Sequence, residues 1–194
     1  MKCPGWLRKG GTTRRPALRL SPMSRGFVKE DDAQTPPLVP PRADLPPGIL
    51  NYVTPNGLEQ LRAELLALEA ERSQAETDHA GNDLDRTHRL SLINGRLALL
   101  AARIASAKII DPATQPPGEV RFGATVRLRT VGGRRAGAER VFTLVGVDEA
   151  DVAAGKVGFV APLARALIGA RVGSQVVLPL GAQPETVEIV QISY

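Results

Sequence analysis

Two leucine-rich stripes in the middle of the chain constrain its fold more than any other feature. In both stripes the apolar residues recur at alternating spacings of three and four, as on the seam of a coiled coil. The stripes consist of Leu58, Leu61, Leu65 and Leu68, and of Leu90, Ile93, Leu97, Leu100, Ile104 and Ala107. Neither helix can bury its stripe alone, and the polar break between them is short. We therefore predict an antiparallel coiled-coil hairpin.

Capping and breaking residues set the limits of this hairpin. Thr54-Pro55 is typical of a helix start, with threonine as N-cap and proline at the first helical position. Gly81 suits the end of the first helix, and Asp111-Pro112 stops the second. We predict a hairpin over residues 51–111 and a linker over residues 112–118, which contains Pro116-Pro117-Gly118.

Short strand patterns follow the linker. Val126 and Leu128 alternate with arginines, and residues 141–145 form a compact apolar run typical of a strand. Further short strands are expected at residues 157–160, 176–178 and 187–190, with a helix at 162–168 that Gly169 ends. These elements predict an α+β fold, in which a small antiparallel-sheet domain spans residues 119–194.

The positive charge is concentrated at the N-terminus. The chain has a net charge of +5, and residues 1–22 carry +6, which leaves −1 for the remainder. The basic character therefore belongs to the tail rather than to the folded part. We interpret residues 1–22 as a basic disordered tail or a start-site artefact. Residues 23–50 contain repeated prolines and are expected to form a disordered linker.

Several classes of protein are excluded by composition. Cys3 is the single cysteine, so neither a disulfide framework nor a thiolate metal site is expected, and a cytoplasmic location is the plain interpretation. No apolar run is long enough to cross a bilayer. His79 and His88 are the two histidines, too few to indicate a metal site or a nucleophilic triad.

Two motifs resemble a known family. Residues 145–151 read Val-Gly-Val-Asp-Glu-Ala-Asp, and residues 161–169 read Ala-Pro-Leu-Ala-Arg-Ala-Leu-Ile-Gly. With Gly155-Lys156 between them, they resemble the C-terminal signature of the GreA/GreB transcript-cleavage factors, with Ala161 in place of a serine. Residues 23–32, Met-Ser-Arg-Gly-Phe-Val-Lys-Glu-Asp-Asp, resemble the start of a GreB-like subgroup. The resemblance covers residues 23–194 and suggests a subgroup with a shortened coiled coil.

The resemblance implies an accessory factor rather than an enzyme. Such a factor binds bacterial RNA polymerase at the rim of its secondary channel, enters or covers that channel, and modulates elongation or transcript cleavage. It implies an FKBP-like fold for residues 119–194, a monomer, no membrane contact, and indirect contact with DNA or RNA in the elongation complex. It implies no cofactor of the chain's own, since any magnesium ion would be shared with the polymerase active site.

The hairpin tip is the candidate catalytic element. The resemblance implies that tip carboxylates help to hold the shared magnesium ion, and the candidates here are Asp83 and Asp85. The tip departs from the family pattern because Asn82 is inserted, and each arm is about a heptad shorter, which removes about 10 Å of reach. Asp83 and Asp85 could instead serve as ordinary helix caps, or act as acidic groups that dock or plug the channel.

A second candidate site lies in the sheet domain. The resemblance implies a polymerase-binding face, and a proline-apolar patch ringed by charge suits protein binding. Its candidate residues are Asp148, Glu149, Asp151, Pro162, Leu163 and Arg165. The acidic residues could instead form a solvated turn, and Leu163 could belong to the core.

Three alternatives remain open on sequence grounds. The shortened arms favour a non-cleaving regulator of the secondary channel, similar to the regulator of nucleoside diphosphate kinase. An FKBP-like peptidyl-prolyl isomerase is disfavoured because the domain has few aromatics, namely Phe122, Phe142, Phe159 and Tyr194. A plain coiled-coil interaction protein does not account for the C-terminal motifs.

Overall fold

The computed structural model describes residues 38–78, 82–132, 135–179 and 184–194. The predictions for residues 1–22 and for most of the segment 23–50 lie outside these ranges, as does the proposed helix end at Gly81. Residues 38–50, the described part of that segment, contain no helix or strand.

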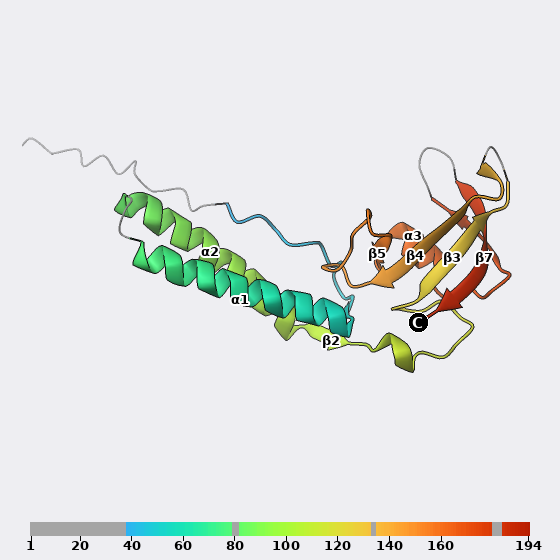
Figure 1. Ribbon diagram of the computed structural model, residues 1–194, viewed down its shortest axis with the longest axis horizontal. Coiled ribbons are helices and arrows are strands. Elements are labelled where there is room, and N and C mark those ends of the chain that lie inside the picture. The colour runs from blue at the N-terminus through green and yellow to red at the C-terminus, as the bar shows by residue number, and fades with distance from the viewer. Residues whose placement is uncertain (1–37, 79–81, 133–134, 180–183) are drawn as a thin grey trace, which may run out of the picture. The chain divides into compact units, whose positions relative to one another are not determined.

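Two long helices form the predicted hairpin (Figure 1). Helix α1 spans Pro55–Thr77 and α2 spans Asp83–Ala105. Thr54 is the N-cap of α1, and its hydroxyl accepts a hydrogen bond from the amide of Gly57 at 2.9 Å, as the sequence predicts. The two stripes meet, and the buried seam residues include Leu58, Leu61, Leu68, Ala75, Ile93 and Leu100.

A pair of short parallel strands closes the base of the hairpin. Strand β1 (Asn51–Val53) enters α1, and β2 (Ala107–Ile109) leaves α2. Ala107 packs on the hairpin core as the seam predicts, but it does so from β2, so the prediction that it is helical is wrong. The side chain of Asn51 donates to the carbonyl of Arg103 at 2.9 Å, so a residue distant in sequence ends α2 and redirects the chain.

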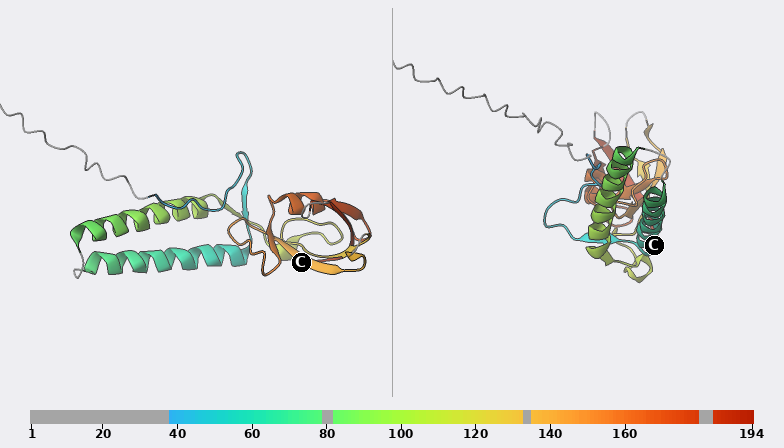
Figure 2. Two further views of the ribbon diagram at one scale, coloured as in Figure 1. Left: turned by 90° about the horizontal axis from the view of Figure 1, so that it is seen from above. Right: turned by 90° about the vertical axis from the view of Figure 1, so that its left-hand side faces the viewer.

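The remaining strands form one curled, five-stranded sheet of order β5-β4-β3-β7-β6 (Figures 1 and 2). Short turn η1 (Pro112–Thr114) precedes them. The strands are β3 (Thr125–Thr130), β4 (Glu139–Val145), β5 (Lys156–Gly158), β6 (Gln175–Leu178) and β7 (Glu185–Ser193). The pairing is antiparallel except between β4 and β5, which run parallel because the loop of residues 146–155 carries the chain back across the sheet.

One face of this sheet packs on helix α3 (Pro162–Leu167). The core between them is apolar and fully enclosed, and it includes Val126, Leu128, Leu144, Ala164, Leu167, Leu178 and Ile189. The fold class is thus confirmed as α+β, with a helical hairpin followed by a sheet domain. The boundaries drawn between domains stay predictions.

A third apolar cluster joins the hairpin base to the sheet domain. Tyr52 of β1 packs against Phe122 and Phe159, with ring centroids 5.8 and 5.5 Å away. Phe122 and Phe159 meet edge to face at 5.5 Å. Tilted and edge-to-face arrangements are favourable for aromatic pairs. The base of the hairpin is therefore attached to the sheet domain by side-chain packing as well as by the chain itself.

Candidate functional site

The hairpin tip presents its acidic residues at the start of α2. Asn82 is the N-cap, and its side-chain oxygen accepts a hydrogen bond from the amide of Leu84 at 3.1 Å. Asp83 and Asp85 follow in the first turn, and both are exposed. Asn82, rather than either aspartate, is therefore the N-cap. Their charge still suits the positive end of the helix.

The two tip carboxylates do not point the same way. Residues two apart on a helix are separated by about 200° around its axis. Asp83 forms an ion pair with Arg86 at 2.9 Å, but its side chain is 90% exposed, where such pairs stabilise little. On the other side of the tip, Asp78 lies 3.9 Å from Arg89. The two side chains therefore leave α2 on different sides of its axis.

In the sheet domain, Asp148 is buried in the loop that follows β4. Its side chain is 9% exposed and lies between two arginines. Arg42 donates to Oδ1 from Nε and from a terminal nitrogen, at 3.1 and 3.0 Å. Nε of Arg103 lies 3.3 Å from Oδ2, close enough for an ion pair, although Oδ2 has no hydrogen bond among the described residues. Asp148 thus faces inward rather than toward a partner.

Glu149 is buried against the start of α1. Its Oε2 accepts a hydrogen bond from the Thr54 hydroxyl at 2.5 Å. Its Oε1 accepts from the side chains of Asn56 at 3.0 Å and Lys156 at 3.1 Å. The carboxylate therefore lies at the positive end of the helix and beside an ammonium group, both of which stabilise negative charge.

These partners decide the ionisation of Glu149. Burial by itself raises the pKa of a carboxyl group. Hydrogen bonds from Thr54, Asn56 and Lys156 outweigh burial here, so the pKa of Glu149 is lower than its ordinary value. Glu149 is therefore a structural carboxylate, ionised in the folded protein at neutral pH.

The other four predicted residues surround β5. Asp151 is exposed and organises the turn before β5, where Oδ1 accepts from the amide of Ala153 at 2.9 Å. Pro162 and Arg165 are exposed on α3, which packs beside β5, whereas Leu163 is half-buried against the core. The structure thus leaves Asp151, Pro162 and Arg165 open to solvent on elements that border the same strand.

Sequence analysis missed the cationic partners of the acidic loop. Arg42 lies in the proline-rich segment, and Arg103 lies among many charged residues on α2, so neither has a distinctive pattern. Gly57 and Gly95 did indicate a close contact from elsewhere in the chain, because glycine is unfavourable in the interior of a helix. A Cβ at Gly57 would lie 2.8 Å from Oε2 of Glu149, and one at Gly95 would overlap Val39.

The chain offers no metal centre of its own in the part that the structure describes. No group of three or more His, Cys, Asp or Glu side chains lies close enough together there to hold an ion. Among the described residues, no helix is both long enough and apolar enough to span a membrane.

Comparison with known proteins defines the class. Residues 115–194 match the family model for the C-terminal part of the transcription elongation factors GreA/GreB. The chain is 34% identical over 154 residues to transcription elongation factor GreA of Thermodesulfovibrio yellowstonii, covering 73% of this chain and 96% of that protein. It is 34% identical over 157 residues to GreB of Neisseria meningitidis serogroup A, covering 74% and 94%. The chain therefore belongs to the GreA/GreB family of transcription elongation factors.

Family membership confirms the resemblance found in the sequence. GreA/GreB factors are accessory factors of transcription, so RNA polymerase is the implied partner. Among solved structures, a GreA/GreB factor from Nitrosomonas europaea is 26% identical and covers 74% of this chain and 98% of its own, with a TM-score of 0.36. That superposition is loose, and the family assignment rests on the sequence matches.

Proposed function

We propose that the protein is an RNA polymerase accessory factor that enters or covers the secondary channel and modulates elongation or transcript cleavage. The observation that carries the proposal is the pair of exposed carboxylates at the tip of a long hairpin. Helix α1 has 23 residues, a length of about 35 Å. Since the base of α1 is held by Glu149, the tip carboxylates lie a full helix length from that contact.

The tip fits a shared magnesium ion, provided that the polymerase supplies most of the ligands. Magnesium prefers carboxylate oxygens, and a second metal stabilises the attacking and leaving oxygens in phosphodiester cleavage. One tip carboxylate can face such an ion. Asp85, which has no ion pair among the described residues, is the simpler ligand, and Asp83, whose exposed pair with Arg86 is weak, is the second candidate.

For polymerase binding we propose a face made of Asp151, Pro162, Leu163 and Arg165. Three of these side chains are exposed, and Leu163 supports them from the core side. Asp148 and Glu149, also predicted for this face, are buried in internal contacts. They would act by fixing the loop that displays Asp151.

Cleavage in a stalled elongation complex tests the tip. With the shortened arms we expect weak stimulation by the wild-type protein, and loss of that stimulation in Asp85→Asn and in Asp83→Asn/Asp85→Asn. Both aspartates are exposed and neither caps α2, so loss of their favourable interaction with the helix dipole should lower the melting temperature only slightly. Glu59→Gln/Glu69→Gln, two exposed charges on the flank of α1, serves as the matched control.

Binding must be measured beside cleavage in that experiment. Competition with a GreA protein for core polymerase should be unchanged for the tip variants and weaker for Arg165→Glu. Stimulation that survives Asp83→Asn/Asp85→Asn would refute the role of the tip. Binding with no stimulation by the wild type would favour the second candidate, a non-cleaving regulator of the channel, which the shortened arms support.

The structure offers little support for a peptidyl-prolyl isomerase. Phe122 and Phe159 are buried against Tyr52, and the hydroxyl of Tyr194 is hydrogen-bonded to the carbonyl of Glu119 at 2.6 Å. These aromatic side chains are engaged in contacts within the fold.

A further inference from the structure

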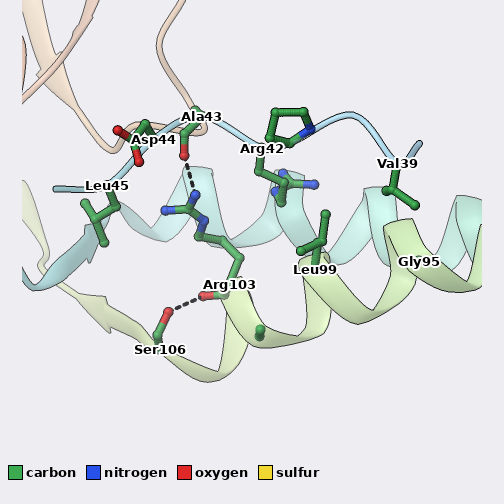
Figure 3. Close-up of a pocket in the computed structure, with 11 residues that line it drawn as sticks. Val39, Arg42, Ala43, Asp44, Leu45, Gly95, Leu99, Arg103 and Ser106 are labelled. Atoms are coloured by element: carbon green, nitrogen blue, oxygen red, sulfur yellow. Dashed lines mark hydrogen bonds between the residues drawn. The ribbon is translucent and has the colours of Figure 1, made fainter. Parts of the chain in front are cut away.

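Residues 38–45, which we call the strap, run along α2 in an extended conformation (Figure 3). Prolines at positions 40 and 41 exclude a helix there. Val39 lies directly on Gly95, and a side chain at Gly95 would overlap its methyl group. Glycine is disfavoured inside a helix. Its presence in the middle of α2 is explained by the close approach of the strap.

Arg42 connects the strap to two other parts of the fold. Its terminal nitrogens donate to both oxygens of Glu64 on α1, at 2.9 and 3.0 Å. Nε and one of the same nitrogens also donate to Asp148 in the loop after β4. Bidentate bonds between arginine and carboxylate are among the strongest in proteins. The pKa of Glu64 is accordingly lowered, chiefly by its hydrogen bonds from Arg42.

Arg103 completes an arginine–carboxylate network with Arg42, Glu64 and Asp148. From α2 it faces Asp148 at 3.3 Å and donates a hydrogen bond to the carbonyl of Ala43 in the strap (Figure 3). The network has two positive and two negative charges, so it is balanced as long as every member is present. Loss of Arg42 leaves a buried carboxylate with one partner, which is unfavourable.

Apolar packing of the strap is incomplete. A groove of about 740 Å³ lies between the strap and α2, lined in part by Leu45, Leu99 and Ala102. This groove is open to solvent, and the apolar contacts of the strap are those of Val39 on Gly95 and of Leu45 on the aromatic cluster. Arg42 makes four of the side-chain hydrogen bonds of the segment, beside the one from Arg103 to Ala43, so a change at this side chain removes the strap's links to Glu64 and Asp148.

We infer that the strap is a releasable clamp that fixes the base of the hairpin to the loop after β4. Two adjacent carboxylates of that loop, Asp148 and Glu149, bind different elements of the fold. Glu149 is held by the start of α1, whereas Asp148 is held by the strap together with α2. The strap belongs to no helix or strand, so its release need not unfold either. Releasing it removes one of the contacts between the hairpin base and the sheet domain and widens the hairpin's range of motion, while Glu149 and the aromatic cluster keep the two parts together.

Distances between spin labels test this clamp in the chain alone, without reference to polymerase. Cysteines replace exposed Ser91 on α2 and exposed Gln175 on β6, in a Cys3→Ser background. We expect a narrow distance distribution for the otherwise unchanged protein and at least a doubled width in Arg42→Gln. A protein lacking residues 1–45 should show the same broad distribution, and one lacking residues 1–37 should stay narrow.

Arg72→Gln is the matched control, because Arg72 forms an exposed ion pair with Glu76 within α1 and should leave the distribution narrow. Helical circular dichroism shows whether each variant is folded. If Arg42→Gln loses helix, the protein lacking residues 1–45 decides, because removal of the whole strap also opens Asp148 to water. Narrow distributions in both strap variants, or a broad one on removal of residues 1–37 alone, would overturn the inference.

Discussion

At the scale of the residue, glycines mark the positions where distant parts of the chain touch. Alanine at an exposed helix position is better than glycine by about 1 kcal/mol. At Gly57, however, a Cβ would meet Glu149 Oε2 at 2.8 Å, and at Gly146 it would meet the carbonyl oxygen of Tyr52 at 2.9 Å. Both glycines allow the hairpin base and the sheet domain to approach closely. This close contact, rather than the conformational preference of glycine, accounts for the two glycines.

Glu149 gives the first prediction at this scale. Its folded pKa lies below the ordinary value, so its stabilisation is fully present above about pH 4.3 and is lost as the pH falls through the folded pKa. We expect Glu149→Gln to lower the free energy of unfolding by ~1–3 kcal/mol at neutral pH. The difference from wild type should shrink below about pH 4.

Urea unfolding at a series of pH values measures this effect. Glu69→Gln, an exposed glutamate on the same helix that Glu149 contacts, should change stability by less than ~0.5 kcal/mol. A Glu149→Gln penalty of the same size at neutral and acid pH would mean that the ionised carboxylate is not the stabilising form.

At the scale of the element, the hairpin is held by its seam rather than by helix propensity. Leu68 is 3% exposed in that seam, whereas Leu66, two residues earlier on α1, is 67% exposed. We expect Leu68→Ala to lower the free energy of unfolding by ~2–5 kcal/mol, because it leaves a cavity. Leu66→Ala should change it by less than ~0.5 kcal/mol. Denaturation followed by helical circular dichroism measures the stability of both variants. Equal losses in the free energy of unfolding would contradict the assignment of Leu68 to the buried seam.

At the scale of the whole described fold, the aromatic cluster couples two otherwise separate cores. The hairpin seam and the sheet core share no residues, and Tyr52, Phe122 and Phe159 lie between them. We expect Phe122→Ala to destabilise the protein by ~3–5 kcal/mol and to let the hairpin open independently of the sheet. Hydrogen exchange followed by mass spectrometry resolves the two regions.

Phe142→Ala is the comparison for that experiment, because Phe142 packs on the sheet core. It should speed exchange in the sheet while the hairpin keeps its protection. If both substitutions changed exchange in the two regions equally, the coupling would have to lie elsewhere than in the cluster.

Local and periodic features were determined by the sequence. The hairpin, the Thr54 cap, the strand positions around Val126 and Leu144, and α3 after Pro162 follow from residue spacing and capping chemistry that act within a few residues. The family motifs were also visible because they are contiguous. The exposed positions of Asp83 and Asp85 at the tip follow from the same local rules.

The tertiary structure alone decided where the acidic loop of the sheet domain points. In sequence, Asp148 and Glu149 resemble a solvated turn or a binding face, and nothing nearby marks them as buried. Their partners come from far along the chain, with 106 residues separating Arg42 from Asp148 and 95 separating Thr54 from Glu149. A carboxylate is buried when its charge is paired, and only the folded chain brings these pairs together.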